Sequence, residues 1–370
     1  MTIQSLRTNA QFSGDIWVCI VDGLATTQSD KLESSGVHTM TLADLEIRNQ
    51  HQMLVAYSTI ELCSSLKPYV IEKLLDMGYE QVWFCDSDLY FYNPIDLDDL
   101  LVQHSILVTP HITRIQNLKS AWAARRILQT GIVNLGFIAL TKKFPNYALS
   151  WWKAKMFDQC LNLPEQGIFF DQRWMDLLLS TVPDAYCFRG TQANVAFWNL
   201  AERQLQISDK RVMADGQPLQ FVHFSGVPID SSKLTQELFP WVAAENALVF
   251  DQLIRDYRSE VIQLGYRESL SNRFVVKFQT FERDEAIRVL YRNADQQTRE
   301  RIGNPFENED SLDEWLTETV HHPAFKEPVS RYVVGQWQIW TTTHPEMQWR
   351  QFDRKTFLDN VKQVQPNLIG

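Results

Sequence analysis

Two patterns of hydrophobic and polar residues divide the chain. In its first part, short apolar runs end abruptly in polar or turn-forming residues. These runs occupy residues 16–21, 82–85, 106–109 and 132–140, the last interrupted by Asn134 and Gly136. Apolar runs of this length are typical of strands buried on both faces of a parallel sheet. Apolar residues also recur every three or four positions from 66 to 77 and are followed by Gly78, which predicts a helix ending there.

A hairpin and two more helices are predicted further along. Residues 211–220 contain an Asp-Gly pair at 215–216, which two-residue hairpin turns favour. The hairpin leads into an apolar run that carries His223 to its end. Helical spacing covers residues 148–157 and 171–179. Strand, helix and strand in succession favour right-handed crossovers, so the expected class is α/β.

The pattern of hydrophobic and polar residues changes near Pro240. Long amphipathic patterns cover residues 241–264 and 284–301, and residues 311–314 have the sequence of a capping box. We therefore expect an α/β domain over residues 1–238 and a helical C-terminal domain over residues 239–370.

Charge and composition narrow the class of protein. The 370 residues carry a formal net charge of −10 and have no run rich in Lys or Arg, which argues against nucleic acid as a partner. No apolar run is long enough for a membrane span, so at most peripheral membrane contact is expected. The N-terminal residues lack the apolar core of a signal peptide, and the five cysteines are scattered without a Cys-x-x-Cys pair. These features favour reduced thiols and a cytoplasmic location.

The chemistry concentrates where the run at 82–85 meets Asp86 and Asp88. Ligands of α/β sheets bind beyond the carboxyl ends of the strands, so both carboxylates are expected at a ligand site. Mg²⁺ and Mn²⁺ prefer oxygen donors and often combine one or two carboxylates with substrate phosphates. The pattern therefore predicts a metal-dependent enzyme that acts on a nucleotide-linked substrate.

Four motifs in order resemble those of retaining GT-A glycosyltransferases. They are Asp86-Ser87-Asp88, Asn134-Leu135-Gly136, Asp171-Gln172 and His223-Phe224-Ser225-Gly226. Their order and spacing resemble the group that contains glycogenin and bacterial lipopolysaccharide galactosyltransferases. The segment 61–68, Glu-Leu-x-x-x-Leu-Lys-Pro, brings the chain closer to bacterial glycosyltransferases of polysaccharide assembly. The resemblance covers about residues 16–233.

The resemblance implies a GT-A, Rossmann-like fold with a mixed, mainly parallel sheet, and a set of site residues. The metal ligands implied are Asp86, Asp88 and His223; the donor and sugar-binding residues are Lys67, Asp86, Asn134, Gly136, Asn194 and Gly226; and the catalytic residues are Asp171 and Gln172. Imidazole suits Mn²⁺ better than Mg²⁺, so Mn²⁺ is the first candidate. Gln172 would have a positioning role beside the anomeric carbon, and Trp198, near Asn194, is a candidate for stacking on sugar.

The implied reaction transfers a hexose, with retention, from a nucleotide-diphosphate sugar to a cell-surface or lipid-linked glycan, and a UDP-sugar is the first donor to test. Two alternatives stay open. A haloacid-dehalogenase-type phosphatase also uses Asp-x-Asp after an apolar strand. A non-catalytic carbohydrate- or nucleotide-binding protein could keep the fold, because the residues before Ile16 show no buried strand where this group has its base-binding strand.

Single residues also have plainer interpretations. Asp171 could be only the N-cap of its helix, and His223 could be a satisfied histidine at a strand end. Lys67 could face solvent at a helix start, and Asn134 could satisfy the backbone of a distorted strand.

Overall fold

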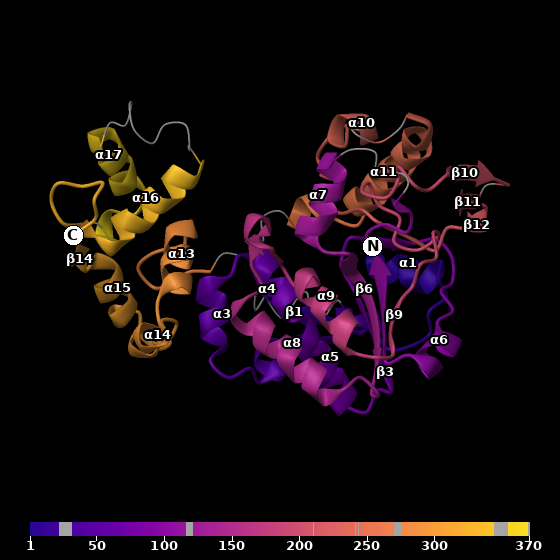
Figure 1. The fold of residues 1–370 in the computed structure, drawn as a ribbon, viewed down its shortest axis with the longest axis horizontal. Coiled ribbons are helices and arrows are strands. Elements are labelled where there is room, and N and C mark those ends of the chain that lie inside the picture. The colour runs from indigo at the N-terminus through magenta and orange to yellow at the C-terminus, as the bar shows by residue number, and fades with distance from the viewer. Residues whose placement is uncertain are drawn as a thin grey trace. The chain divides into compact units, whose positions relative to one another are not determined.

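The computed structural model describes residues 1–21, 32–115, 121–209, 211–240, 242, 244–269, 276–343 and 354–368. The chain divides into two compact units (Figure 1). Unit 1 comprises Met1–Leu45 and Cys63–Arg273, and unit 2 comprises Glu46–Leu62 and Phe274–Gly370. Residues 239–273, which the sequence pattern assigned to the C-terminal domain, thus lie in unit 1. None of the helices in the described ranges is long and apolar enough to cross a membrane.

A four-stranded sheet forms the centre of unit 1. Its order is β3 (Gln81–Cys85), β6 (Val133–Thr141), β5 (Ile106–Pro110) and β9 (Ala185–Cys187). Strand β6 is antiparallel to both of its neighbours, whereas β5 and β9 are parallel. Strands β3, β5 and β9 therefore run in one direction and β6 runs in the other. The predicted α/β class with a mixed sheet is confirmed, and the three apolar runs at 82, 106 and 132 are its three longest strands.

Helices cover both faces of this sheet. Figure 1 shows α5 (Lys67–Asp76), α8 (Asn146–Asp158) and α9 (Gln172–Thr181) on one side and α6 (Asp98–Gln103) on the other. The three helices predicted at 66–77, 148–157 and 171–179 are confirmed. Their apolar faces are buried, as at Ile71, Trp152 and Met175. Helix α7 (Ala121–Thr130) leads into β6.

Shorter strands of unit 1 lie outside the central sheet. Strand β1 (Trp17–Ile20) pairs in parallel with β2 (His38–Thr41), and β4 (Leu89–Phe91) is antiparallel to β13 (Phe221–His223). The predicted hairpin is confirmed by β11 (Arg211–Ala214) and β12 (Gln217–Pro218). Its turn residues Asp215 and Gly216 have φ of +50° and +77°, the left-handed region that this turn needs. Strand β10 (Leu205–Ser208) extends the hairpin on its other side.

The N-terminal residues form a helix, α1 (Thr2–Thr8), which packs on β4. The remaining elements of unit 1 are η1 (Ala43–Leu45), β7 (Asn162–Leu163), η3 (Pro164–Gln166), β8 (Ile168–Phe169), α10 (Thr235–Leu238), α11 (Ala244–Gln263) and α12 (Tyr266–Ser269).

Unit 2 is mostly helical, as the sequence pattern predicts for the C-terminal part. It contains α3 (Gln50–Ala56), α13 (Glu285–Asn293), α14 (Gln296–Ile302), α15 (Asp310–Thr317), α16 (Arg331–Thr343), α17 (Arg354–Val364), β14 (Thr319–Val320), β15 (Val329–Ser330) and η5 (Pro366–Leu368). The single helix predicted over 284–301 is wrong. Two helices replace it because Asp284 and Asp295 each cap a new N-terminus, accepting from Ile287 N (3.0 Å) and Thr298 N (2.7 Å).

The capping box predicted at residues 311–314 is also wrong, because α15 begins at Asp310 and Glu309 at its N-cap makes no side-chain cap hydrogen bond. A true capping box opens α4 (Thr59–Ser65) instead. Ser58 N donates to Glu61 Oε2 (2.7 Å), and Glu61 N donates to Ser58 Oγ (3.3 Å). The boundary between the two units falls within this helix.

Buried polar contacts join the two chain segments of unit 2. Arg283 Nη1 donates to the carbonyl oxygens of Leu54 (2.9 Å) and Tyr57 at the end of α3. Arg288 Nη1 pairs with Glu61 Oε2 at 2.9 Å, and both side chains are largely buried. Residues 46–62 are therefore an integral part of this unit.

Candidate metal centre

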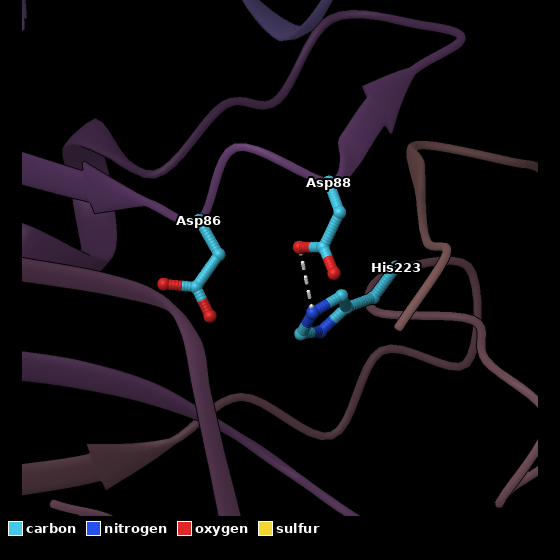
Figure 2. Close-up of side chains that lie close together, drawn as sticks. All are labelled: Asp86, Asp88 and His223. Carbon is cyan, nitrogen blue, oxygen red and sulfur yellow. Dashed lines mark ion pairs between the residues drawn. The ribbon is translucent and has the colours of Figure 1, made fainter. Parts of the chain in front are cut away.

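Two chain segments bring three possible metal ligands together. Asp86 and Asp88 lie in the turn between β3 and β4, and His223 ends β13, where it pairs with Leu89. This pairing places His223 Nε2 3.0 Å from Asp88 Oδ1. Figure 2 shows Asp88 and His223 facing each other with Asp86 beside them, and one ligand atom from each lies within 4.8 Å of the others. Ligands about 2.1 Å from one octahedral ion lie about 3 to 4.2 Å apart. The contact of Asp88 with His223 lies at the lower end of this range, and the limit for all three atoms lies just above it, so the group is near the spacing that a divalent cation needs.

The tautomer of His223 strengthens this fit. Its Nδ1 lies 3.0 Å from Asn134 Oδ1, which also accepts from Gly136 N at 3.1 Å. The backbone donor identifies that atom of Asn134 as the oxygen, so Nδ1 of His223 carries a proton. In a neutral imidazole, Nε2 is then a lone pair facing a carboxylate oxygen. Two acceptors at this distance repel unless a proton or a metal ion lies between them.

The same contact affects Asp88. Burial raises the pKa of the Asp88 carboxyl, but the hydrogen bond and the positive charge that His223 supplies when Nε2 is also protonated outweigh burial, so the pKa of Asp88 is lowered overall. Asp88 is therefore ionised at neutral pH, as a metal ligand must be. An oxygen, oxygen and nitrogen donor set favours Mn²⁺ or a later transition metal over Ca²⁺.

An irregularity in β6 makes room for His223. The pairing of β5 with β6 shifts between Val108, opposite Ile138, and Thr109, opposite Asn134. Gly136 lies in the displaced stretch, and its carbonyl accepts from Asp86 N at 2.8 Å. A Cβ at position 136 would lie 2.4 Å from Cε1 of His223. The glycine that the sequence singled out therefore lies against the imidazole and allows its close approach.

Lys67 links the metal centre to Asp171. Its Nζ, almost fully buried, lies 2.9 Å from Asp171 Oδ2, 3.3 Å from Asp86 Oδ1 and 2.9 Å from Leu135 O. Burial alone would lower the pKa of Lys67, but the two carboxylates raise it, so the ammonium stays charged. Its three donors are all directed at protein oxygens. Its predicted contact with donor phosphates remains a prediction.

Asp171 lies at the N-cap position of α9 but makes no cap hydrogen bond with its side chain. The carboxylate pairs with Lys67 instead, so capping does not explain this residue. Gln172, the first residue of α9, donates from Nε2 to Thr130 O at 2.7 Å. The two predicted catalytic residues are thus adjacent in the chain. Asp171 forms an ion pair with Lys67, and Gln172 hydrogen-bonds the turn before β6.

The structure adds a residue that sequence reasoning missed. His111 follows β5 directly, is almost fully buried, and its Nδ1 lies 2.8 Å from Gly131 O. Burial lowers the pKa of His111 to about 4, so it is neutral. The signal was available, because a polar residue after a buried strand was the reason for choosing Asp86. His111 and Gln172 hold adjacent carbonyls of the same turn, Thr130 and Gly131.

Asn194 and Trp198 lie beside these groups. Asn194 is fully buried, and its Nδ2 lies 3.0 Å from Thr109 Oγ1 and 3.3 Å from Asn134 Oδ1. Trp198 makes edge contacts with His111 (ring centroids 5.5 Å apart) and His223 (5.3 Å). The structure therefore brings Asn194 and Trp198 to the metal centre.

Gly226 lies in the turn after β13 with φ of +71°, and its nearest neighbour for an added Cβ is Phe197. No hydrogen bond among the described residues joins it to the three candidate ligands. Its donor-binding role stays a prediction.

Comparison with known proteins gives distant likenesses. No protein-family model matches the chain. An uncharacterised Bacillus subtilis protein, YfnF, is 27% identical over 206 residues, covering 54% of this chain and 68% of YfnF. YfnD from the same bacterium is 25% identical over 179 residues, covering 47% of this chain and 56% of YfnD. The matched region thus spans about two thirds and just over half of these relatives.

Among solved structures, the galactosyltransferase LgtC, in complex with donor and acceptor sugar analogs, has a TM-score of 0.39 and 11% identity, covering 70% of this chain and 90% of that one. These values do not assign a family, so the functional argument rests on the geometry of the site.

Proposed function

We propose that this protein is a metal-dependent glycosyltransferase, with Mn²⁺ as the first candidate ion, that transfers a hexose from a nucleotide-diphosphate sugar to a glycan acceptor. The observation that carries the proposal is the contact of His223 Nε2 with Asp88, since Asn134 fixes the tautomer in which a proton or a metal ion must lie between these two atoms. A divalent cation held by Asp86, Asp88 and His223 would neutralise the charge that develops on the leaving diphosphate.

The reaction needs few protein groups beyond these. The acceptor oxygen forms a bond to the anomeric carbon, the bond from that carbon to the diphosphate breaks, and the nucleoside diphosphate leaves with the electron pair and takes up the hydroxyl proton. Lys67 keeps Asp86 and Asp171 in place, and Asp171 and Gln172 position the sugar and acceptor. Retention, a cell-surface acceptor and a cytoplasmic location follow from the sequence resemblance and composition and are part of the proposal.

The phosphatase alternative fits the site less well. It needs Asp86 as a nucleophile and Asp88 as a proton donor. Asp86 is held by Lys67, and the lowered pKa of Asp88 makes it a poor acid. The binding-protein alternative keeps the same nucleotide site and differs only in turnover.

Thermal unfolding with Mn²⁺ and UDP, GDP or CDP, against each component alone, tests the donor site. A ligand that binds only the folded state raises the midpoint by mass action. We expect a shift that needs Mn²⁺ and one nucleotide together and that Asp88→Asn abolishes. Asp99→Asn, an exposed residue of α6, is the matched control and should keep the shift. The absence of a shift with every pair would contradict the proposal.

Release of the nucleoside diphosphate from the matching sugar nucleotide separates an enzyme from a binding protein. We expect Mn²⁺-dependent release that Asp88→Asn and His223→Ala abolish. A tight nucleotide complex with no release, with or without a glycan acceptor, would favour the binding protein. Release of inorganic phosphate from a simple phosphate ester, lost in Asp86→Asn, would favour the phosphatase.

A further inference from the structure

Three polar atoms beside the metal centre lack partners in the part of the chain that the structure describes. Asn194 Oδ1 and Trp198 Nε1 are both buried without a hydrogen bond. The third is Nε2 of His111. Its Nδ1 donates to Gly131 O, so Nε2 of this neutral ring carries a lone pair, and none of the described residues hydrogen-bonds it. Buried polar atoms without a partner, such as those of Asn194 and Trp198, are rare and point to a missing ligand or water.

These atoms lie around one group of rings. Trp198 contacts the edges of both His111 and His223, and Asn194 Nδ2 reaches Asn134 Oδ1, the atom that holds His223. The unpaired set therefore adjoins the candidate metal ligand on the side of β5 and β6. It contains two acceptors, His111 Nε2 and Asn194 Oδ1, and one donor, Trp198 Nε1.

This combination suits hydroxyl groups. A hydroxyl donates one hydrogen bond and accepts others, so a ring bearing several hydroxyls can satisfy acceptors and a donor together. An indole also offers an apolar face to a sugar ring. Water could fill the same positions, but it would not use that face.

Lys67 and the two arginines nearest to His111 and Gln172 in the chain are already paired with carboxylates. Lys67 directs its donors at Asp171, Asp86 and a carbonyl. The cations closest in sequence to His111 and Gln172 are Arg114, which pairs with Asp215, and Arg173, which pairs with Asp176. Each of these three cations is therefore already paired with a carboxylate of the protein.

We propose, resting on the glycosyltransferase function above, that His111, Asn194 and Trp198 form the sugar-binding part of the donor site and that it takes a neutral hexose rather than a hexuronate. Each residue is a binding residue in this proposal, and His111 supplies an acceptor to a sugar hydroxyl.

His111→Asn isolates that acceptor. An asparagine amide can replace Nδ1 in the bond to Gly131 O but offers nothing at the position of Nε2. His104→Asn is the matched control, because His104 precedes β5 as His111 follows it, and its Nδ1 lies 3.0 Å from Asp184 O. Calorimetry would measure Mn²⁺-dependent binding of the nucleoside diphosphate, its neutral hexose conjugate and its hexuronate conjugate.

For wild type, we expect the neutral conjugate to bind at least about tenfold more tightly than the hexuronate. His111→Asn should weaken the neutral conjugate by about tenfold, the value of one good hydrogen bond, and leave the nucleoside diphosphate unchanged. His104→Asn should change neither.

Equal affinity of wild type and His111→Asn for the neutral conjugate, or equal affinity of wild type for both conjugates, would overturn this inference and leave the proposed function standing. A wild type that binds no nucleoside diphosphate would overturn both. A parallel loss of nucleotide binding in His111→Asn would show a structural role and also overturn the inference.

Discussion

Gly136 lies directly against His223, with the position of its missing Cβ 2.4 Å from Cε1 of the imidazole. A methyl group there must displace the ring. Gly136→Ala should therefore weaken Mn²⁺ binding strongly, by about 100-fold, while Gly216→Ala should only lower stability, by about 1 kcal/mol, because its φ is +77° and its surroundings are open. Titration of Mn²⁺ followed by electron paramagnetic resonance measures both. Unchanged affinity in Gly136→Ala would contradict the assigned contact.

Asn134 is expected to act through His223 rather than on a metal ion directly. Its Oδ1 accepts from His223 Nδ1, so Asn134→Leu removes the group that fixes the tautomer. Loss of such a partner typically reduces metal affinity 10- to 100-fold. Asn134→Asp keeps the acceptor and should retain most of the affinity. Equal Mn²⁺ affinity in wild type and Asn134→Leu would rule out this positioning role.

Removing Lys67 alone should destabilise the fold more than removing Lys67 together with the charge of its partner Asp171. Lys67→Met leaves Asp86 and Asp171 without their cation, and an uncompensated buried charge costs about 3 to 5 kcal/mol. The double variant Lys67→Met/Asp171→Asn should recover part of that free energy of unfolding. Urea unfolding at pH 7 measures the difference. A double variant less stable than Lys67→Met would mean that the carboxylate is not the source of the cost.

His111 should make the protein sensitive to acid. Its pKa is about 4 in the folded chain against 6.5 for an ordinary histidine, so the unfolded chain binds the proton more readily. The contribution of neutral His111 to the free energy of unfolding, up to about 3 kcal/mol, is fully present above pH 6.5 and is lost as the pH falls toward 4. His111→Asn has no such group, so its free energy of unfolding should fall less between pH 7 and 4.5. Parallel curves for the two proteins would disprove the burial of a neutral imidazole.

We expect Glu61 to stabilise unit 2 and to have no effect on metal binding. Glu61→Ala removes both the capping box with Ser58 and the partner of Arg288. The loss of a buried ion pair should cost about 3 to 5 kcal/mol. Hydrogen exchange in α3 and α13 should rise, while Mn²⁺ affinity of the folded protein stays the same. Unaltered exchange in both helices would show that other contacts hold this unit together.

Local patterns predicted the elements well and their assembly less well. The apolar runs at 82, 106 and 132 were correctly predicted as strands, because the apolar sequence of a buried strand can be recognised without knowing which strand it pairs with. The pairing of His223 with Leu89 joins residues far apart in the chain, and no local pattern encodes it. His223 became a candidate only through its resemblance to a motif. His111 lies just beyond Pro110, where the apolar run has ended, and a single histidine there forms no motif that the sequence reveals.

The helical half shows the limit more clearly. The spacing of apolar residues over 284–301 continues across the break at Ala294, so only the capping aspartates reveal two helices. The place of residues 46–62 in unit 2 depends on Arg283 and Arg288, more than 200 positions away. Side-chain pairs of that separation cannot be read from periodicity.

The two-segment construction of unit 2 has a consequence for synthesis on the ribosome. Residues 46–62 emerge about 210 residues before their partner segment begins at 274. At translation rates of about 5 to 20 residues per second, the interval is on the order of tens of seconds. Three apolar side chains of this segment are buried in the folded chain, those of Met53, Val55 and Tyr57. During this interval they lack the partner segment. A nascent chain stalled before residue 274 would therefore expose the apolar side chains of α3, which makes this segment a natural target for chaperones.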